Sequence, residues 1–145
     1  VNLGKAMEEW FKLHPELVDK YKKNPDHIPG IFRYPEPVEG AIDAINKLAD
    51  SGKYELHIAT AAPWGNPESL TDKRYWIERH FKSLFHKRLT VTHRKDMLMG
   101  DYLIDDRQAN GASGFLGELL SFGWDYENKK WNEYPTWETI LEKLL

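Results

Sequence analysis

The stretch DYLIDDR, residues 101–107, is the segment that decides the fold class of this chain. Its apolar centre, residues 102–104, predicts a buried strand, and Asp105 and Asp106 follow at the C-terminal end of that strand. Adjacent carboxylates repel each other unless a positive charge lies between them, and Mg²⁺, which takes oxygen ligands, supplies such a charge. Both aspartates are therefore candidate metal ligands. The alternative is a turn or helix-capping role, which is common for aspartate where strands stop.

Two further polar side chains follow predicted strands upstream of this stretch. The strand predicted over residues 55–60 ends in the hydroxyl of Thr60, and Lys95 comes shortly after the strand predicted over residues 88–92. Ligands of parallel sheets bind at the carboxyl ends of the strands, so we expect both side chains to approach the aspartate pair. The combination predicts a site for a phosphate and a metal ion. The alternatives are a threonine that merely finishes a strand and an ordinary surface lysine.

The rest of the chain alternates helical and strand patterns. Helices are predicted over residues 7–22, with a break at Pro15, and over residues 37–49, 70–84 and 137–145. Strands are predicted over residues 55–60, 88–92, 102–105 and 119–122, and a turn or short helix over residues 93–99. Ser69 or Thr71 is expected to cap the third helix, and Thr136 the last one. This alternation predicts an α/β fold with a mainly parallel sheet and flanking helices.

Composition excludes several functional classes. The chain has 145 residues, of which 41% are hydrophobic and 13% aromatic, as expected for one globular domain. A net charge of −3 gives no basic field for nucleic-acid binding. The absence of cysteine excludes disulfides, a thiolate zinc site and a cysteine nucleophile. No apolar run reaches membrane-spanning length, no signal peptide is visible, and a cytoplasmic location is the expectation.

The motifs resemble those of the haloacid dehalogenase-like (HAD) phosphatases, and within them the 5′(3′)-deoxyribonucleotidase family. HIATAAP, residues 57–63, is similar to the second motif of the family, and THRK, residues 92–95, to the third. GDYLIDDR, residues 100–107, is similar to the fourth, metal-binding motif. Residues 28–32 and 36–41 resemble the return of the chain from the cap to the core.

The resemblance implies a HAD-like, Rossmann-like core over residues 36–145 and a small helical cap over residues 1–35. It also implies an Mg²⁺-dependent phosphatase that hydrolyses (deoxy)nucleoside 5′-monophosphates through an aspartyl-phosphate intermediate. Asp105 and Asp106 would hold the metal ion. The partner would be a small phosphomonoester, with no role for nucleic acid or a membrane, and the resemblance leaves a homodimer open.

The resemblance also assigns roles at the phosphate. Thr60 and Lys95 would be catalytic residues that bind the phosphate, and Ala61 would donate its backbone N–H to it. Phe32 would stack on the base of the substrate. On the residues alone, Phe32 is equally an aromatic face for a base and an ordinary core phenylalanine.

One motif of the family does not occur in residues 1–145. This first motif, Asp-x-Asp after an apolar strand, carries the nucleophilic aspartate, and its strand lies in the middle of the family's sheet. Because the sequence begins with Val1 rather than methionine, we expect a preceding segment to supply that strand. Two alternatives stay open: a relative that binds a nucleotide or phosphate without catalysis, and a HAD phosphatase for another small phosphomonoester.

Overall fold

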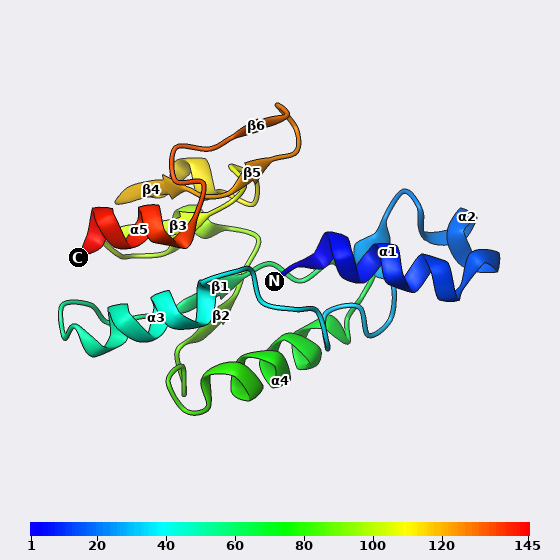
Figure 1. Cartoon of the computed structure of the whole chain (residues 1–145), viewed down its shortest axis with the longest axis horizontal. Coiled ribbons are helices and arrows are strands. Elements are labelled where there is room, and N and C mark those ends of the chain that lie inside the picture. The colour runs from blue at the N-terminus through cyan, green and yellow to red at the C-terminus, as the bar shows by residue number, and fades with distance from the viewer.

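A computed structural model describes the whole chain, residues 1–145, as a mixed α/β structure (Figure 1). The helices are α1 (Leu3–Leu13), α2 (Val18–Tyr21), α3 (Ala41–Asp50), α4 (Ser69–Phe81) and α5 (Trp137–Leu144). The strands are β1 (Ile58–Thr60), β2 (Leu89–Val91), β3 (Tyr102–Asp105), β4 (Glu118–Ser121), β5 (Trp124–Asp125) and β6 (Lys130–Trp131). None of the helices combines the length and the apolar character needed to cross a membrane.

The parallel strands form two separate pairs rather than one sheet. β1 pairs with β2 in parallel, with Thr60 opposite Val91, and β3 pairs with β4 in parallel, with Asp105 opposite Ser121. No ladder of hydrogen bonds joins the pairs, so the prediction of parallel pairing is confirmed, and the gap lies where the central strand of the family's sheet is expected. The physical reason is that no strand of residues 1–145 lies between β1 and β3 to bond to both.

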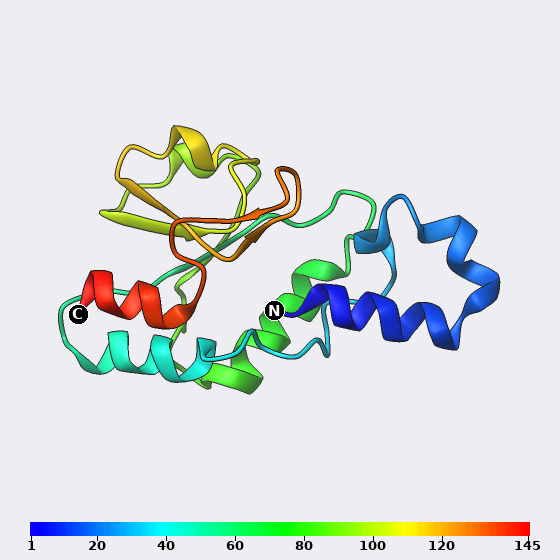
Figure 2. The same ribbon diagram turned by 45° about the horizontal axis from the view of Figure 1, so that its top comes forward.

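Each parallel pair has its own hydrophobic cluster. The cluster behind β3 and β4 consists of Leu48, Leu120, Ile140 and Leu144, and the cluster behind β1 and β2 consists of Trp76, Ile77, Phe81 and Phe85. Helix α3 serves both, because Leu48 belongs to the first cluster while Ile42 and Ile45 pack against the second. Figures 1 and 2 show α3 beside α5 in both views. The two pairs are therefore linked by a helix where they lack a hydrogen-bonded ladder.

The N-terminal segment projects to one side of the strands, as Figures 1 and 2 show. The helical segment predicted over residues 7–22, broken at Pro15, is confirmed as two helices: α1 ends at Leu13, and a 3₁₀ turn, Pro15–Leu17, precedes α2. Proline has no backbone N–H to donate, and its ring clashes with the carbonyl four residues earlier, so a helix cannot continue through Pro15. The segment has a hydrophobic cluster of its own around Ile28, Ile31 and Phe32.

Local signals predicted some boundaries and missed others. Thr136 caps α5 as expected: its side chain accepts the Thr139 N–H, and the Thr139 hydroxyl oxygen accepts the Thr136 N–H in return. Neither Ser69 nor Thr71 caps α4, whose N-cap is Glu68 without a side-chain hydrogen bond. Helix α3 begins at Ala41 rather than at residue 37, because Gly40 adopts a left-handed conformation with φ of 78° just before it. The antiparallel hairpin of β5 and β6 was not predicted.

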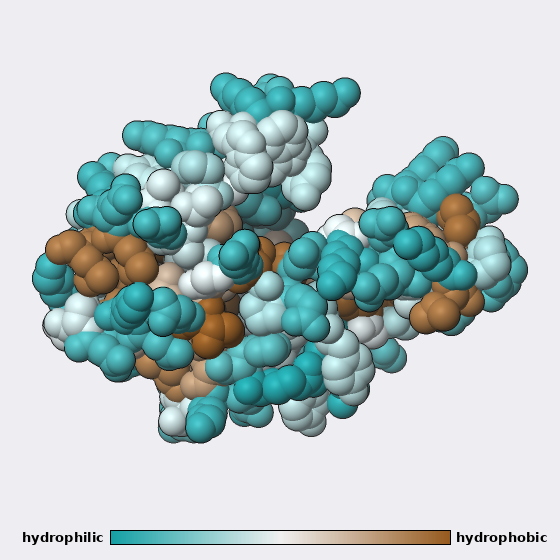
Figure 3. All heavy atoms as spheres, in the orientation of Figure 1, coloured by the Kyte–Doolittle hydropathy of each residue, from teal (hydrophilic) through white to brown (hydrophobic).

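The surface is mostly hydrophilic on the face drawn in Figure 3, with hydrophobic groups gathered near the C-terminus and at the outer end of the α1–α2 segment. Leu13 and Leu145 are exposed by 77% and 51%, respectively. Scattered apolar residues of this kind are normal on a protein surface.

Candidate phosphate and metal site

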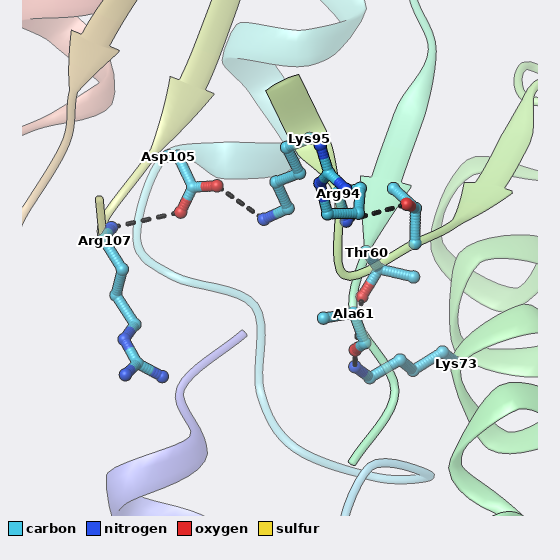
Figure 4. Close-up of polar contacts among 8 residues, drawn as sticks. Thr60, Ala61, Lys73, Arg94, Lys95, Asp105 and Arg107 are labelled. Atoms are coloured by element: carbon cyan, nitrogen blue, oxygen red, sulfur yellow. Dashed lines mark hydrogen bonds and ion pairs between the residues drawn. The ribbon is translucent and has the colours of Figure 1, made fainter. Parts of the chain in front are cut away.

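The end of β1 places a hydroxyl and a backbone carbonyl beside a lysine of α4 (Figure 4). The Nζ of Lys73 donates a hydrogen bond to Thr60 Oγ1 at 3.0 Å and a second one to the carbonyl oxygen of Ala61. The Thr60 hydroxyl in turn donates weakly to the Ala61 carbonyl, at 3.3 Å. Thr60 and Ala61, both predicted at the phosphate, are therefore held together by a cation that the sequence analysis did not assign to the site.

Lys73 is only partly solvated. Burial, and secondarily the positive charge of Lys95, lower the pKa of Lys73 from 10.5 to about 8, and the negative charge of Asp26 only partly opposes this. The Lys73 ammonium also lies over the ring of Phe32, 4.4 Å from its centroid. Because the close partners of Lys73 are neutral groups, its positive charge is poorly compensated in a site of reduced dielectric constant.

Lys95 connects the end of β2 to the end of β3. It opens the 3₁₀ turn Lys95–Met97, and its backbone N–H donates to Asn110 O at 2.7 Å. Its Nζ lies 2.5 Å from Asp105 Oδ2, and the exposed fractions of the two side chains are 12% and 8%. The other carboxylate oxygen of Asp105 accepts the N–H of Arg107 at 3.1 Å. The structure thus brings Lys95 and Asp105 together as a nearly buried ion pair.

Asp106 differs from its neighbour because it forms no ion pair. Although the residue reaches the surface, desolvation by the protein groups crowded around it, and then the negative charge of Asp105, raise the pKa of the Asp106 carboxyl. A carboxylate whose pKa is raised in this way lacks a compensating positive charge, and this suits a divalent cation.

The residues at this position fit Mg²⁺ rather than a metal that needs a cage of side chains. The structure holds no group of three or more His, Asp or Glu side chains that could bind a metal ion. Mg²⁺ keeps several water ligands and is commonly held by one or two carboxylates together with substrate phosphate. Asp105 and Asp106 meet that requirement, and Asp106 is the one whose carboxylate is not already paired with a lysine.

Phe32 lies beside the phosphate end of the site rather than apart from it. Its exposed fraction is 8%, and it packs with Ile28 and Ile31 in the cluster of the N-terminal segment. One face of its ring points to Lys73. By its surroundings Phe32 is therefore a core phenylalanine, while stacking on a base stays a prediction.

Lys73 carries a signal that the sequence analysis overlooked. On α4 it lies three and four residues before Trp76 and Ile77, which are buried, and four residues after Ser69, which is buried too. Residues at these spacings share one face of a helix. A lysine on the buried face of an amphipathic helix that follows a predicted phosphate-binding strand end is a candidate site residue.

A separate hollow of about 430 Å³ lies between α4 and β2. Its lining includes Arg74 and Glu78, which form an ion pair at 2.9 Å, and none of the residues at the strand ends. Because its charged groups balance each other, the hollow offers no comparable chemistry, and we assign the candidate site to the strand ends.

Comparison with known families decides the relationship. The family described as 5′ nucleotidase, deoxy (pyrimidine), cytosolic type C matches residues 3–134. The chain belongs to this family of deoxyribonucleotidases. The predicted family resemblance is therefore confirmed.

Relatives of this deoxyribonucleotidase-family chain include viral and human proteins. A putative 5′(3′)-deoxyribonucleotidase of Vibrio phage KVP40 is 40% identical over 126 residues, which cover 87% of this chain and 69% of the relative. The cytosolic 5′(3′)-deoxyribonucleotidase of Homo sapiens is 32% identical over 136 residues, which cover 94% of this chain and 58% of the human protein. The names of these relatives describe hydrolases of phosphomonoesters, so the family is one of enzymes.

Proposed function

We propose that the protein hydrolyses (deoxy)nucleoside 5′-monophosphates in an Mg²⁺-dependent reaction that passes through an aspartyl-phosphate. The observation that carries the proposal is the meeting of a hydroxyl, two ammonium groups and a carboxylate pair at the carboxyl ends of β1, β2 and β3. Family membership supports the same substrate class, because the relatives are named for deoxyribonucleotides.

Each residue has a chemical part in this proposal. The Thr60 hydroxyl and the Ala61 N–H would bind phosphate oxygens, and Lys95, held by Asp105 at 2.5 Å, would neutralise negative charge as it develops on the phosphoryl group. Asp105 and Asp106 would hold Mg²⁺, which when bound supplies positive charge next to a phosphate oxygen. Phe32 would offer a ring face to the base.

The covalent step needs an aspartate that residues 1–145 do not place at the phosphate. In the proposed reaction an aspartate carboxylate attacks phosphorus, the ester P–O bond breaks, and a general acid gives its proton to the oxygen of the leaving nucleoside. Water then hydrolyses the aspartyl-phosphate to inorganic phosphate. We propose that this aspartate lies on a strand between β1 and β3, since each of these strands has a hydrogen-bonded partner on one edge only.

The test uses the protein expressed from its complete reading frame. We expect Mg²⁺-dependent release of phosphate from dUMP and dTMP, and loss of most of that activity in Asp106→Asn and in Lys95→Ala. Asp43→Asn and Lys47→Ala are matched controls, because these residues form an exposed ion pair on α3 at 2.9 Å, away from the site. Full activity in both site variants would show that the site is assigned wrongly.

The same assay separates the two alternatives. Stabilisation of the protein against heat by nucleotides, without any turnover, would support a relative that binds without catalysis. Phe32→Ala distinguishes substrate classes: we expect it to weaken the use of nucleotides, while a phosphatase for sugar phosphates would keep its activity on those substrates.

A further inference from the structure

Four charged side chains meet at the ends of the two parallel pairs, and only two of them balance each other. Lys95 and Asp105 form the ion pair at 2.5 Å. Lys73, at the β1–β2 end, and Asp106, at the β3–β4 end, have no ion pair. Among residues 1–145 the site therefore keeps one positive charge without an ion pair on its phosphate side and one negative charge without an ion pair on its metal side.

The contacts of Lys73 are neutral acceptors. They are the Thr60 hydroxyl oxygen, the Ala61 carbonyl oxygen and the face of Phe32. The charged groups that act on Lys73 are Lys95, on the turn after β2, and Asp26, in the turn Pro25–His27, and burial together with Lys95 outweighs Asp26. An anion that lies between two such ammonium groups would relieve both the desolvation and the repulsion.

Lys73 also fixes the direction of the Thr60 hydroxyl. A hydroxyl has one proton to donate and accepts through its lone pairs. Because Lys73 Nζ donates to Thr60 Oγ1 at 3.0 Å, the proton of that hydroxyl must point away from Lys73. In the structure the Thr60 hydroxyl donates to the Ala61 carbonyl oxygen, and the two oxygens are 3.3 Å apart. This is a weak hydrogen bond, which a phosphate oxygen would readily replace.

We propose that Lys73 is a second phosphate-binding cation of the site, which contacts the substrate's phosphate dianion and orients the Thr60 hydroxyl toward it. That the bound phosphate belongs to a nucleotide substrate rests on the proposed function. That Lys73 binds a phosphate anion does not. With a pKa of about 8, free Lys73 is charged below that pH and loses its proton above it, so phosphate affinity falls as the pH rises past 8.

Calorimetric titration with inorganic phosphate tests the proposal without requiring turnover. In the protein expressed from its complete reading frame, we expect Lys73→Met to weaken phosphate binding at pH 7 by about 10- to 100-fold, the range for a hydrogen bond to a charged group. Arg74→Met is the matched control, because Arg74 is the next residue of α4 and pairs instead with Glu78. Phosphate affinity within twofold of the wild type in Lys73→Met would overturn the proposal.

A second variant covers the case in which Lys73→Met fails to fold. Lys73→Arg keeps its charge through pH 9, so we expect the ratio of wild-type to Lys73→Arg phosphate affinity to fall between pH 7 and pH 9. The ratio removes the titration of phosphate itself, which both proteins experience equally. A ratio that does not change with pH would contradict the role given to Lys73.

Kinetics with dUMP separate this inference from the proposed function. We expect Lys73→Met to raise KM more than it lowers kcat, since Lys73 binds the phosphate in the ground state as well. If no variant turns over nucleotides but Lys73→Met still loses phosphate affinity, the function is wrong and the anion site stands. If turnover is present while both KM and phosphate affinity are unchanged in Lys73→Met, the function stands and the role of Lys73 is wrong.

Discussion

The carboxyl ends of the β1–β2 and β3–β4 pairs are alike in architecture and opposite in charge. The first places Lys73 on the Thr60 hydroxyl, with Lys95 near enough for its charge to act on Lys73, and the second presents Asp105 and Asp106. Desolvation lowers the pKa of Lys73 and raises the pKa of Asp106, so the same cause drives each group toward neutrality. Each end thus holds a charge that a ligand of the opposite sign would stabilise, a phosphate in one case and a cation in the other.

The two pairs also differ in what holds them in place. The β1–β2 pair rests on aromatic residues of α4 and the following turn, while the β3–β4 pair rests on aliphatic residues of α3, β4 and α5. The ion pair between Lys95 and Asp105 joins their functional ends directly. Substitutions at the ion pair and in each cluster therefore test how far the two pairs depend on each other.

The largest expected effect follows from breaking that ion pair. Lys95→Met leaves the nearly buried Asp105 carboxylate without its partner, and we expect the free energy of unfolding to fall by about 3–5 kcal/mol. Urea denaturation measures the loss. The double variant Lys95→Met/Asp105→Leu is the control, because it removes both charges and is expected to regain most of the stability. Equal loss in the single and double variants would mean that packing, rather than the unpaired charge, is responsible.

A smaller effect separates the two clusters. Leu120 is fully buried behind the β3–β4 pair, and Leu120→Ala is expected to cost about 3 kcal/mol through the cavity that it leaves. Hydrogen exchange should then show lost amide protection in β3, β4 and α5, with protection kept in β1, β2 and α4. Ile77→Ala, in the other cluster, should give the reverse pattern. Uniform loss of protection in both variants would show one cooperative core.

The stability cost of Lys73 should depend on pH. Because its pKa in the folded protein, about 8, is below the ordinary 10.5, the unfolded chain binds more protons between these values, and wild-type stability rises with pH across that window. We expect Lys73→Met to be more stable than the wild type at pH 7, by roughly 1–2 kcal/mol after allowance for solvent screening. The gain should vanish near pH 10.5. Thermal unfolding at several pH values measures it, and a gain that does not vary with pH would contradict the explanation.

The smallest effect concerns the helix behind the β3–β4 pair. Thr136→Ala removes a cap that accepts the Thr139 N–H at 3.3 Å, and we expect a loss of about 1 kcal/mol in unfolding free energy. Thr71→Ala, in the first turn of α4, removes a threonine that caps nothing and should change stability by less than about 0.5 kcal/mol. Denaturant melts of the two variants compare them directly.

The sequence predicted the second parallel pair better than the rest of the fold. Residues 102–105 were predicted as a strand and form β3 with the same bounds. A short apolar run that ends in aspartates favours a buried strand over other local structures. Thr136 marked the start of α5 correctly for an equally local reason. The β5–β6 hairpin escaped prediction because its strands are two residues long. Its turn is held by Asp125, which accepts the N–H groups of Glu127 and Asn128.

The candidate site was predicted where strand ends carry it and missed where a helix does. Asp105 and Lys95, ten residues apart, were expected near each other from strand order alone, and the structure places them in contact. Lys73 is thirteen residues from Thr60 and reaches it only because α4 packs back along β1. Linear spacing does not encode that return. Helical periodicity could have shown that Lys73 faces inward, but not what it would meet there.

Helix α3 has a consequence for how this protein can change by recombination. Its Leu48 packs in one cluster and its Ile42 and Ile45 pack against the other, so about two turns of one helix contact both sets of neighbours. A chimera that exchanges the α5 region with a relative inherits a foreign partner for Leu48, while Ile42 and Ile45 keep their own. Crossovers should therefore survive best when α3 travels together with both the α4 and the α5 segments, which makes the two ends of the site a single unit of inheritance.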